Sequence, residues 1–244
     1  MKKIISLFIV LSLFNCSPED CFESTGTIIQ QEIEVPVFDK INVGEEVTLI
    51  IKQGDTQKIV VETGSNLIDA VAVNVIDGKL FLKDENTCNF TRDYAVTKVY
   101  VTTPNIDEIR SNTARSIMSD GILYFPKLAL ISEDFNEDAL NIGDFNLHIN
   151  NENLNITSNG SSIFKIKGVA RNLRINFYAG TARFEGSNLI ATNISIIQKS
   201  TNDMLVNPQI KIEGAIYSIG NVISYNQPAT IDVIEHYTGH LIFN

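Results

Sequence analysis

A repeat of 20 residues in the C-terminal part of the chain constrains its fold more than any other feature. Gly160, Gly180 and Gly220 are 20 or 40 residues apart, and Ser200 occupies the position between the last two. Each of these positions lies in a short patch of small and polar residues. A fixed period of this length is typical of a solenoid, in which each repeat packs against its neighbours rather than into a closed globule.

Apolar residues at fixed offsets from these polar patches predict two columns of the core. One column follows each patch and the other precedes it: Phe164, Phe184 and Met204, and Ile156, Ile196 and Ile216. Stacked strands pair in register, so equivalent side chains should pack on one another. The polar positions between the columns should face water, together with Tyr178, Tyr217 and Tyr225 among them.

The N-terminal half shows a different pattern. From Ile28 to Thr103, apolar and polar residues alternate in short runs that glycine turns separate, as in strands with one buried face. We expect an all-β fold in which residues 28–103 form either a β-meander or the opening coils of the solenoid, and residues 104–244 form the repeat coils. Because no linker rich in proline or serine divides them, we expect one domain over residues 28–244.

The first residues have the features of a targeting segment. Two lysines precede an apolar run, Ile4–Phe14, which is too short to cross a bilayer but suits a signal peptide. The run ends at Cys16 in a pattern that resembles the lipobox of bacterial lipoproteins. We expect a signal peptide in residues 1–15, lipid on Cys16 and a tether in residues 16–27, hence an outer-membrane lipoprotein displayed in the cell envelope. The alternative is a secreted protein with an incidental cysteine.

Two further cysteines, Cys21 and Cys88, remain once Cys16 is assigned to lipid. In an oxidising envelope compartment an even pair indicates a disulfide. A bridge that closes a loop of this length stabilises a fold by about 4 kcal/mol if it is unstrained. The alternative is two unpaired thiols.

Composition and motifs exclude several classes of function. The formal net charge of −10 argues against nucleic acid as a partner, because phosphates require a basic surface. The sequence patterns of serine hydrolases, zinc proteases, dinucleotide-binding proteins and P-loop proteins do not occur. Because β-helices also carry polysaccharide lyases and hydrolases, the residues that could serve such an enzyme are Arg110, Arg115 and Asp120.

An acidic cluster offers the strongest candidate for a cation or binding face. It consists of Glu133, Asp134, Glu137 and Asp138. Such carboxylates repel one another unless they are solvated or bind a cation, and calcium prefers oxygen ligands of this kind. The spacing is not that of an EF-hand loop, so the alternative is a solvated bulge at a corner of the fold.

Two of the three histidines, His236 and His240, are four residues apart and follow Glu235. In a strand this spacing places them about 13 Å apart on one face. They could share a metal ion only if a turn at Gly239 brought them together. The alternative is a pair of solvent-facing residues near the end of the fold, and the sequence specifies no metal.

Several segments together resemble a bacterial family, the putative auto-transporter adhesin head GIN domain. They are the segment Val37–Val43, the turn at residues 53–55, residues 77–80, residues 225–228, and the units with Ser or Asn before Gly-Ser. The resemblance covers nearly all of residues 28–243. It implies a right-handed parallel β-helix (β-solenoid) similar to pectin lyases, without recognisable catalytic residues, and a role in adhesion.

The chain departs from the family pattern at Ser200, where glycine is usual, and in the irregular coils of residues 104–153. Taken together, these features predict a non-catalytic, lipid-anchored envelope protein that binds a glycan or a surface protein. We expect no cofactor, and calcium is the ion whose binding should be tested. The first alternative is a carbohydrate-active β-helix enzyme, either a polysaccharide lyase or a glycoside hydrolase. The second is a structural envelope protein without a ligand.

Overall fold

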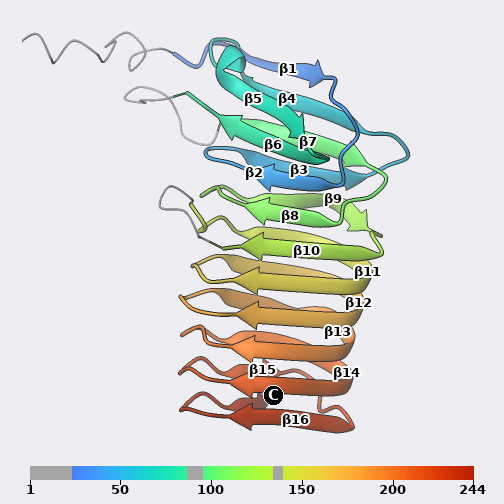
Figure 1. The fold of residues 1–244 in the computed structure, drawn as a ribbon, viewed down its shortest axis with the longest axis vertical. Coiled ribbons are helices and arrows are strands. Elements are labelled where there is room, and N and C mark those ends of the chain that lie inside the picture. Colours follow the sequence, from blue (N-terminus) through green and yellow to red (C-terminus); the bar gives the residue numbers. More distant parts are fainter. Residues whose placement is uncertain (1–23, 87–95, 134–139) are drawn as a thin grey trace, which may run out of the picture.

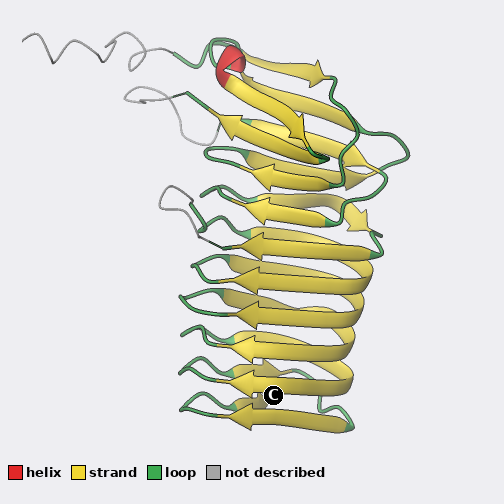
Figure 2. Cartoon of the chain, in the orientation of Figure 1, coloured by secondary structure: helices red, strands yellow, loops and turns green. Residues whose placement is uncertain are grey.

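The structure, a computed structural model, describes residues 24–86, 96–133 and 140–244. Within these ranges the regular elements are strands, apart from one turn of 3-10 helix, η2 (Ile68–Ala70). All seventeen described strands belong to a single sheet that surrounds an elongated apolar core (Figures 1 and 2). The expected all-β class is confirmed. Within these ranges, no helix is long and apolar enough to cross a bilayer.

The strands of the N-terminal half are short, and those of the C-terminal half include four of 13 to 16 residues. The first ten are β1 (Ile28–Ile33), β2 (Lys40–Val43), β3 (Thr48–Gln53), β4 (Lys58–Gly64), β5 (Val71–Ile76), β6 (Lys79–Asp84), β7 (Lys98–Thr103), β8 (Glu108–Ser111), β9 (Ile117–Leu123) and β10 (Lys127–Ser132). The remainder are β11 (Phe145–Ser158), β12 (Ile163–Phe177), β13 (Arg183–Gln198), β14 (Met204–Ile216), β15 (Val222–Ser224), β16 (Thr230–Glu235) and β17 (Leu241–Phe243).

The sheet has two faces, which the long strands β11 to β14 connect by bending from one to the other (Figure 1). The first face runs in the order β5, β6, β2, β8, β10, the C-terminal halves of β11 to β14, and β16. The second runs in the order β1, β4, β7, β3, β9, the N-terminal halves of β11 to β14, β15 and β17. A layer is one strand of each face, and side chains from both faces fill the space between them.

The predicted column of Phe164, Phe184 and Met204 is confirmed. Phe164 pairs in register with Phe184, and Phe184 with Met204. The column continues through Phe145 on one side and Val222 on the other, and all five side chains are fully buried. The rings of Phe145 and Phe164 stack at a centroid distance of 4.8 Å. Successive members are 18 to 20 residues apart, as the repeat indicated.

The second predicted column is correct for two of its three members. Ile156 and Ile196 share a column with Ile175 between them, but Gly214 occupies the next position. Ile216 pairs with Gln198 instead, one inward position further along the strand. The register of β13 and β14 shifts at two irregularities. Because side chains alternate with a period of two, a displacement of two residues keeps Ile216 in the core.

The N-terminal half contains both antiparallel and parallel strand pairs. Antiparallel pairing of β1 with β4, β4 with β7, and β5 with β6 forms the end of the stack. Parallel pairing forms the layers below it, and the layer of β2 and β3 lies between that of β6 and β7 and that of β8 and β9. After β2 and β3 the chain therefore forms the layers on one side of them, up to β7, and then passes to their other side to form β8 and β9.

The repeating polar patches form corners that bond from layer to layer. Thr181 donates its backbone N–H to Gly160 O at 2.9 Å, and Gly180 has a φ of +79°. A Cβ atom at Gly180 would lie 2.3 Å from Gly160 O, so this corner requires glycine. Ser200 is buried, and its hydroxyl donates to Ala182 O at 2.6 Å. The hydroxyl therefore has a partner, which explains why serine is accepted at that corner.

A candidate binding groove and the predicted sites

An open groove of about 1080 Å³ lies on the first face, near the end of the stack that carries β1. Strands β5, β6 and β2 line it, together with Asn112, which directly follows β8. The segment Glu34–Pro36, which connects β1 to β2, forms a side wall. The groove is thus built from segments that are far apart in the sequence.

Phe81 occupies the centre of the lining strands. Its neighbours Leu80 and Leu82 are buried in the core, so alternation directs Phe81 to the outer side of β6. In register it pairs with Asn74 of β5 and with Asn42 of β2. The ring, which is half-buried, is therefore flanked by two carboxamides. Asn42 Oδ1 in turn accepts a hydrogen bond from Asn112 Nδ2 at 2.9 Å.

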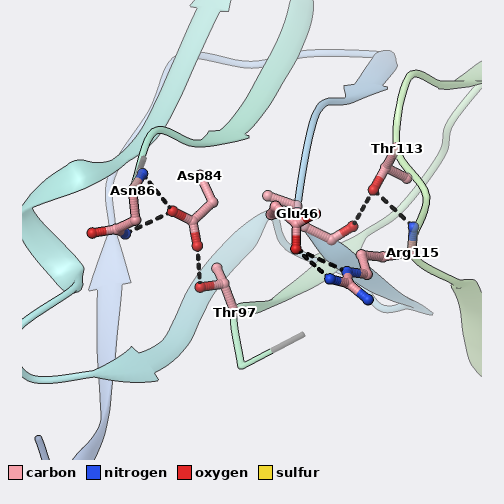
Figure 3. Close-up of polar contacts among 7 residues, drawn as sticks. Glu46, Asp84, Asn86, Thr97, Thr113 and Arg115 are labelled. Carbon is pink, nitrogen blue, oxygen red and sulfur yellow. Dashed lines mark hydrogen bonds and ion pairs between the residues drawn. The ribbon is translucent and has the colours of Figure 1, made fainter. Parts of the chain in front are cut away.

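One end of the groove is fixed by the contacts drawn in Figure 3. Glu46, which follows the lining residue Glu45, has a φ of +58° and ends a tight turn. Its carboxylate accepts two hydrogen bonds from Arg115, of which the one from Nε measures 3.1 Å. Thr113 Oγ1 accepts from the backbone N–H of Arg115 at 3.0 Å. Arg115 therefore holds this turn in place through its ion pair with Glu46.

Asp84 holds the adjoining strand end in the same way (Figure 3). Its carboxylate accepts from the backbone N–H of Asn86 at 2.9 Å and from Thr97 Oγ1 at 2.5 Å. Its own backbone N–H donates to Glu45 O at 3.2 Å. The two acidic lining residues at this end, Glu45 and Glu85, are therefore attached to well-bonded segments.

The charge of the groove is predominantly acidic. Glu34, Glu45 and Glu85 contribute three carboxylates, and Lys83 is the one basic side chain among the described lining residues. Lys83 Nζ lies 4.0 Å from Glu85 Oε1, and both are exposed. An excess of negative charge therefore remains.

A second, smaller hollow of about 500 Å³ lies on the same face over β10 to β14. Asn153, Asn172 and Asn193 form a ladder across it, in which Nδ2 of each later residue donates to Oδ1 of the preceding one at 3.0 Å. Lys127 and Lys211 occupy the next positions in register on either side. This face therefore presents carboxamides in both hollows.

The predicted lipidation and disulfide residues, Cys16, Cys21 and Cys88, lie outside the described residues. The same is true of three members of the acidic cluster: Asp134, Glu137 and Asp138. Glu133 is described, and it is half-buried directly after β10. The calcium and binding-face hypothesis for this cluster therefore stays a prediction.

The residues proposed for an enzyme are not brought together. Asp120 pairs with Lys52 at 3.3 Å on the second face, whereas Arg110 lies on β8 of the first face. Arg115 is engaged by Glu46. Arg110 and Asp120 thus lie on strands of opposite faces, and Arg115 lies in the turn between β8 and β9.

The histidines of the C-terminal layer have structural partners. His236 stacks on Tyr217 with a ring-centroid distance of 4.4 Å, and His240 Nδ1 lies 2.8 Å from Glu235 Oε2. The hydrogen bond with His240, followed by that from the backbone of Leu241, lowers the pKa of Glu235. In residues 24–86, 96–133 and 140–244, no group of three His, Cys, Asp or Glu side chains could hold a metal ion.

The three predicted solvent-facing tyrosines are exposed by 44%, 46% and 42% for Tyr178, Tyr217 and Tyr225. Tyr178 and Tyr217 begin equivalent corners two layers apart, with Lys199 at the corner between them. Lys199 Nζ lies 5.2 Å from the centroid of the Tyr217 ring. Tyr225 lies after β15, at a different corner. The tyrosines therefore do not form one patch.

A further ionised cluster lies on the second face, at the end of the stack. Hydrogen bonds from Gln30 and Lys98 lower the pKa of Glu62, and the hydrogen bond to Glu62 raises the pKa of Lys98. Burial, together with the nearby Glu62 charge, raises the pKa of Tyr100. Because Glu62 cross-links β1, β4 and β7, this cluster supports the end of the fold.

Sequence reasoning did not identify the main groove. Alternation could place Phe81 on an outer surface, but no local pattern predicts that β5 and the segment Glu34–Pro36 lie beside β2 and Asn112. The sequence signal for the groove is Phe81, an aromatic residue at an outward position of a strand whose inward positions are Leu80 and Leu82.

Comparison with known proteins identifies one matching family and several solved structures with a similar fold. The family described as "putative auto-transporter adhesin, head GIN domain" matches residues 37–228. No curated protein matches the chain. The fold is similar to the crystal structure of a putative adhesin from Bacteroides fragilis NCTC 9343, with 18% identity and a TM-score of 0.80 over 91% of this chain and 100% of that one.

Two structures from Parabacteroides distasonis ATCC 8503 are also similar. One is a putative adhesin, with 14% identity and a TM-score of 0.65 over 91% of this chain and 100% of that one. The other is a putative lipid binding protein, with 14% identity and a TM-score of 0.62 over 90% and 99%. At these identities the likeness concerns the fold. Since the family match spans most of the stacked layers, the chain belongs to the putative auto-transporter adhesin, head GIN domain family.

Proposed function

We propose that this protein is a lipid-anchored component of the cell envelope that binds a surface ligand without catalysis and serves in adhesion. The observation that carries the proposal is the open groove on the first face, which combines an aromatic ring with carboxamides on well-bonded strands. Such a lining can hold a ligand through many weak contacts, whereas catalysis requires titratable groups that converge on one point. The family description and the compared adhesins support the same class of function.

The proposed anchor is lipid on Cys16, after removal of a signal peptide of residues 1–15. Residues 24–27 lead into β1, which lies at the end of the stack (Figure 1). Attachment there would direct the layers from β8 to β16 away from the membrane. This geometry supports display of the stacked layers toward the medium from an outer-membrane lipoprotein.

We also infer that the parallel layers wind as a right-handed β-helix. The support is the register step of 18 to 20 residues between layers, together with the strong preference for right-handed connections between parallel strands of one sheet.

The proposed Cys21–Cys88 disulfide gains support from neighbouring described residues. Asn66 Nδ2 donates to Ser24 O at 2.8 Å, and Ser24 is three residues after Cys21. Asn86 Nδ2 donates to Leu67 O at 3.1 Å, and Asn86 is two residues before Cys88. The described chain closest to each cysteine in sequence thus contacts the same turn.

The function is tested by presenting the purified full chain to immobilised glycans and surface proteins, while released reducing ends are measured in the same wells. We expect retention on at least one surface and no depolymerisation. Cleavage of any polysaccharide by the wild-type protein would contradict the proposal and favour the enzyme alternative. Absence of retention on every surface would contradict adhesion.

A further inference from the structure

We propose that the groove around Phe81 is a binding site for an uncharged oligosaccharide, with the ring as a stacking platform and Asn42, Asn74 and Asn112 as hydrogen-bonding groups. This inference rests on the proposed surface-binding function and assigns it a site and a ligand class. The groove has a volume of about 1080 Å³ and is open to solvent, so a chain-like ligand could continue beyond it.

The aromatic platform is positioned by strand pairing rather than by a loop. Phe81 lies between Asn74 and Asn42 in the registers of β5 with β6 and of β6 with β2. Leu80 and Leu82, on either side of it in the chain, are anchored in the core. An aromatic ring on a fixed backbone offers a large contact area and loses little conformational freedom on binding. It therefore suits the apolar face of a sugar ring.

The carboxamides have hydrogen-bonding capacity left over. Asn42 and Asn112 use one acceptor and one donor on each other, at 2.9 Å. Among the described residues, Asn42 Nδ2, Asn112 Oδ1 and the side chain of Asn74 have no protein partner. Amides supply both donors and acceptors, as sugar hydroxyls require. Asn74 of β5 and Asn42 of β2 therefore flank the ring on two sides, and Asn112, after β8, lies beyond Asn42.

The charge of the lining distinguishes between ligand classes. Glu34, Glu45 and Glu85 outnumber Lys83, so an anionic glycan or a phosphate-bearing headgroup would meet repulsion. An acyl chain would remove the carboxamides from water without replacing their hydrogen bonds, which is unfavourable. A neutral sugar meets neither obstacle.

The test is affinity electrophoresis of the detergent-solubilised full chain in gels that contain one polysaccharide each. The probes are neutral xylan, mannan, starch and mixed-linkage β-glucan, with polygalacturonate as the acidic comparison. Phosphatidylcholine vesicles are tested separately by co-sedimentation. The variants are Phe81→Leu in the groove and Tyr225→Leu as the control, because Tyr225 is an exposed aromatic residue at a corner after β15. Thermal unfolding of each variant verifies that it is folded.

We expect at least one neutral polysaccharide to retard the wild-type protein. Phe81→Leu should weaken this retardation about fivefold to tenfold, the effect of one aromatic contact, while Tyr225→Leu retains it. Retardation that is equal in the two variants would overturn the groove assignment but leave surface binding standing. Preference for polygalacturonate, or vesicle binding that Phe81→Leu abolishes, would overturn the ligand class. No retention by any polysaccharide, vesicle or immobilised protein would contradict both the site and the proposed function.

Discussion

Gly186→Ala tests how tightly the aromatic column is packed. A Cβ atom at Gly186 would lie 2.3 Å from Cε1 and 2.5 Å from Cζ of Phe184. Carbon atoms in contact are about 3.5–4.0 Å apart, so the ring would have to move by about 1 Å. Phe184 is fully buried between Phe164 and Met204, which leaves it no space in either direction along the stack.

Overpacking of this kind lowers the free energy of unfolding by about 1–3 kcal/mol. In a chain of this size, a loss of about 2 kcal/mol lowers the Tm by roughly 4–8 °C. A smaller side chain at position 184 should therefore relieve the clash. Phe184→Leu removes the clashing ring atoms and should itself cost about 1–2 kcal/mol. In that background Gly186→Ala should cost less than about 1 kcal/mol, since Leu205 O at 3.2 Å is then the remaining close atom.

The assay is urea unfolding with and without Gly186→Ala in three backgrounds: the wild type, Phe184→Leu and Phe145→Leu. The coupling energy is the difference in the cost of Gly186→Ala between backgrounds. Phe145→Leu is the control, because it removes an equally buried ring two layers away from Phe184. We expect a coupling of at least about 1 kcal/mol for Phe184→Leu with Gly186→Ala, and additivity for Phe145→Leu with Gly186→Ala. If Gly186→Ala costs the same in all three backgrounds, the ring contact is not its cause and the packing argument is refuted.

The remaining predictions concern the anchor, the bridge and the end of the fold. Cys16→Ala should transfer the protein from the membrane to the soluble fraction, and normal processing with retention on the membrane would exclude the lipid anchor. Mass spectrometry of a non-reduced digest should find Cys21 and Cys88 in one linked peptide pair, whereas free thiols in envelope-derived protein would exclude the bridge. Glu62→Gln should lower the free energy of unfolding by about 1 kcal/mol at neutral pH. Because the pKa of Glu62 is lower in the folded state than its ordinary value of 4.5, its contribution is present above pH 4.5 and is lost as the pH falls through the folded pKa. Urea titrations below pH 4.5 should therefore show a shallower loss of stability in Glu62→Gln than in the wild type, and parallel losses would contradict the assignment.

The sequence by itself determined the spacing of the layers and the main column of the core. Phe164, Phe184 and Met204 stack as their period indicated, because parallel strands paired in register convert a repeat in sequence into a contact in space. Alternation likewise determined which residues of a strand face outward, as at Phe81. These properties are local, so a single chain segment contains the information needed to predict them.

The tertiary structure decided the features that depend on which strands become neighbours. The position of β2 and β3 between two later layers follows from long-range pairing among strands with equivalent alternation, which no local pattern distinguishes. Ile216 left its predicted column because a register displacement of two residues preserves burial and is therefore invisible in the hydrophobic pattern. The groove around Phe81 was decided in the same way, because its walls come from segments that only the folded topology brings together.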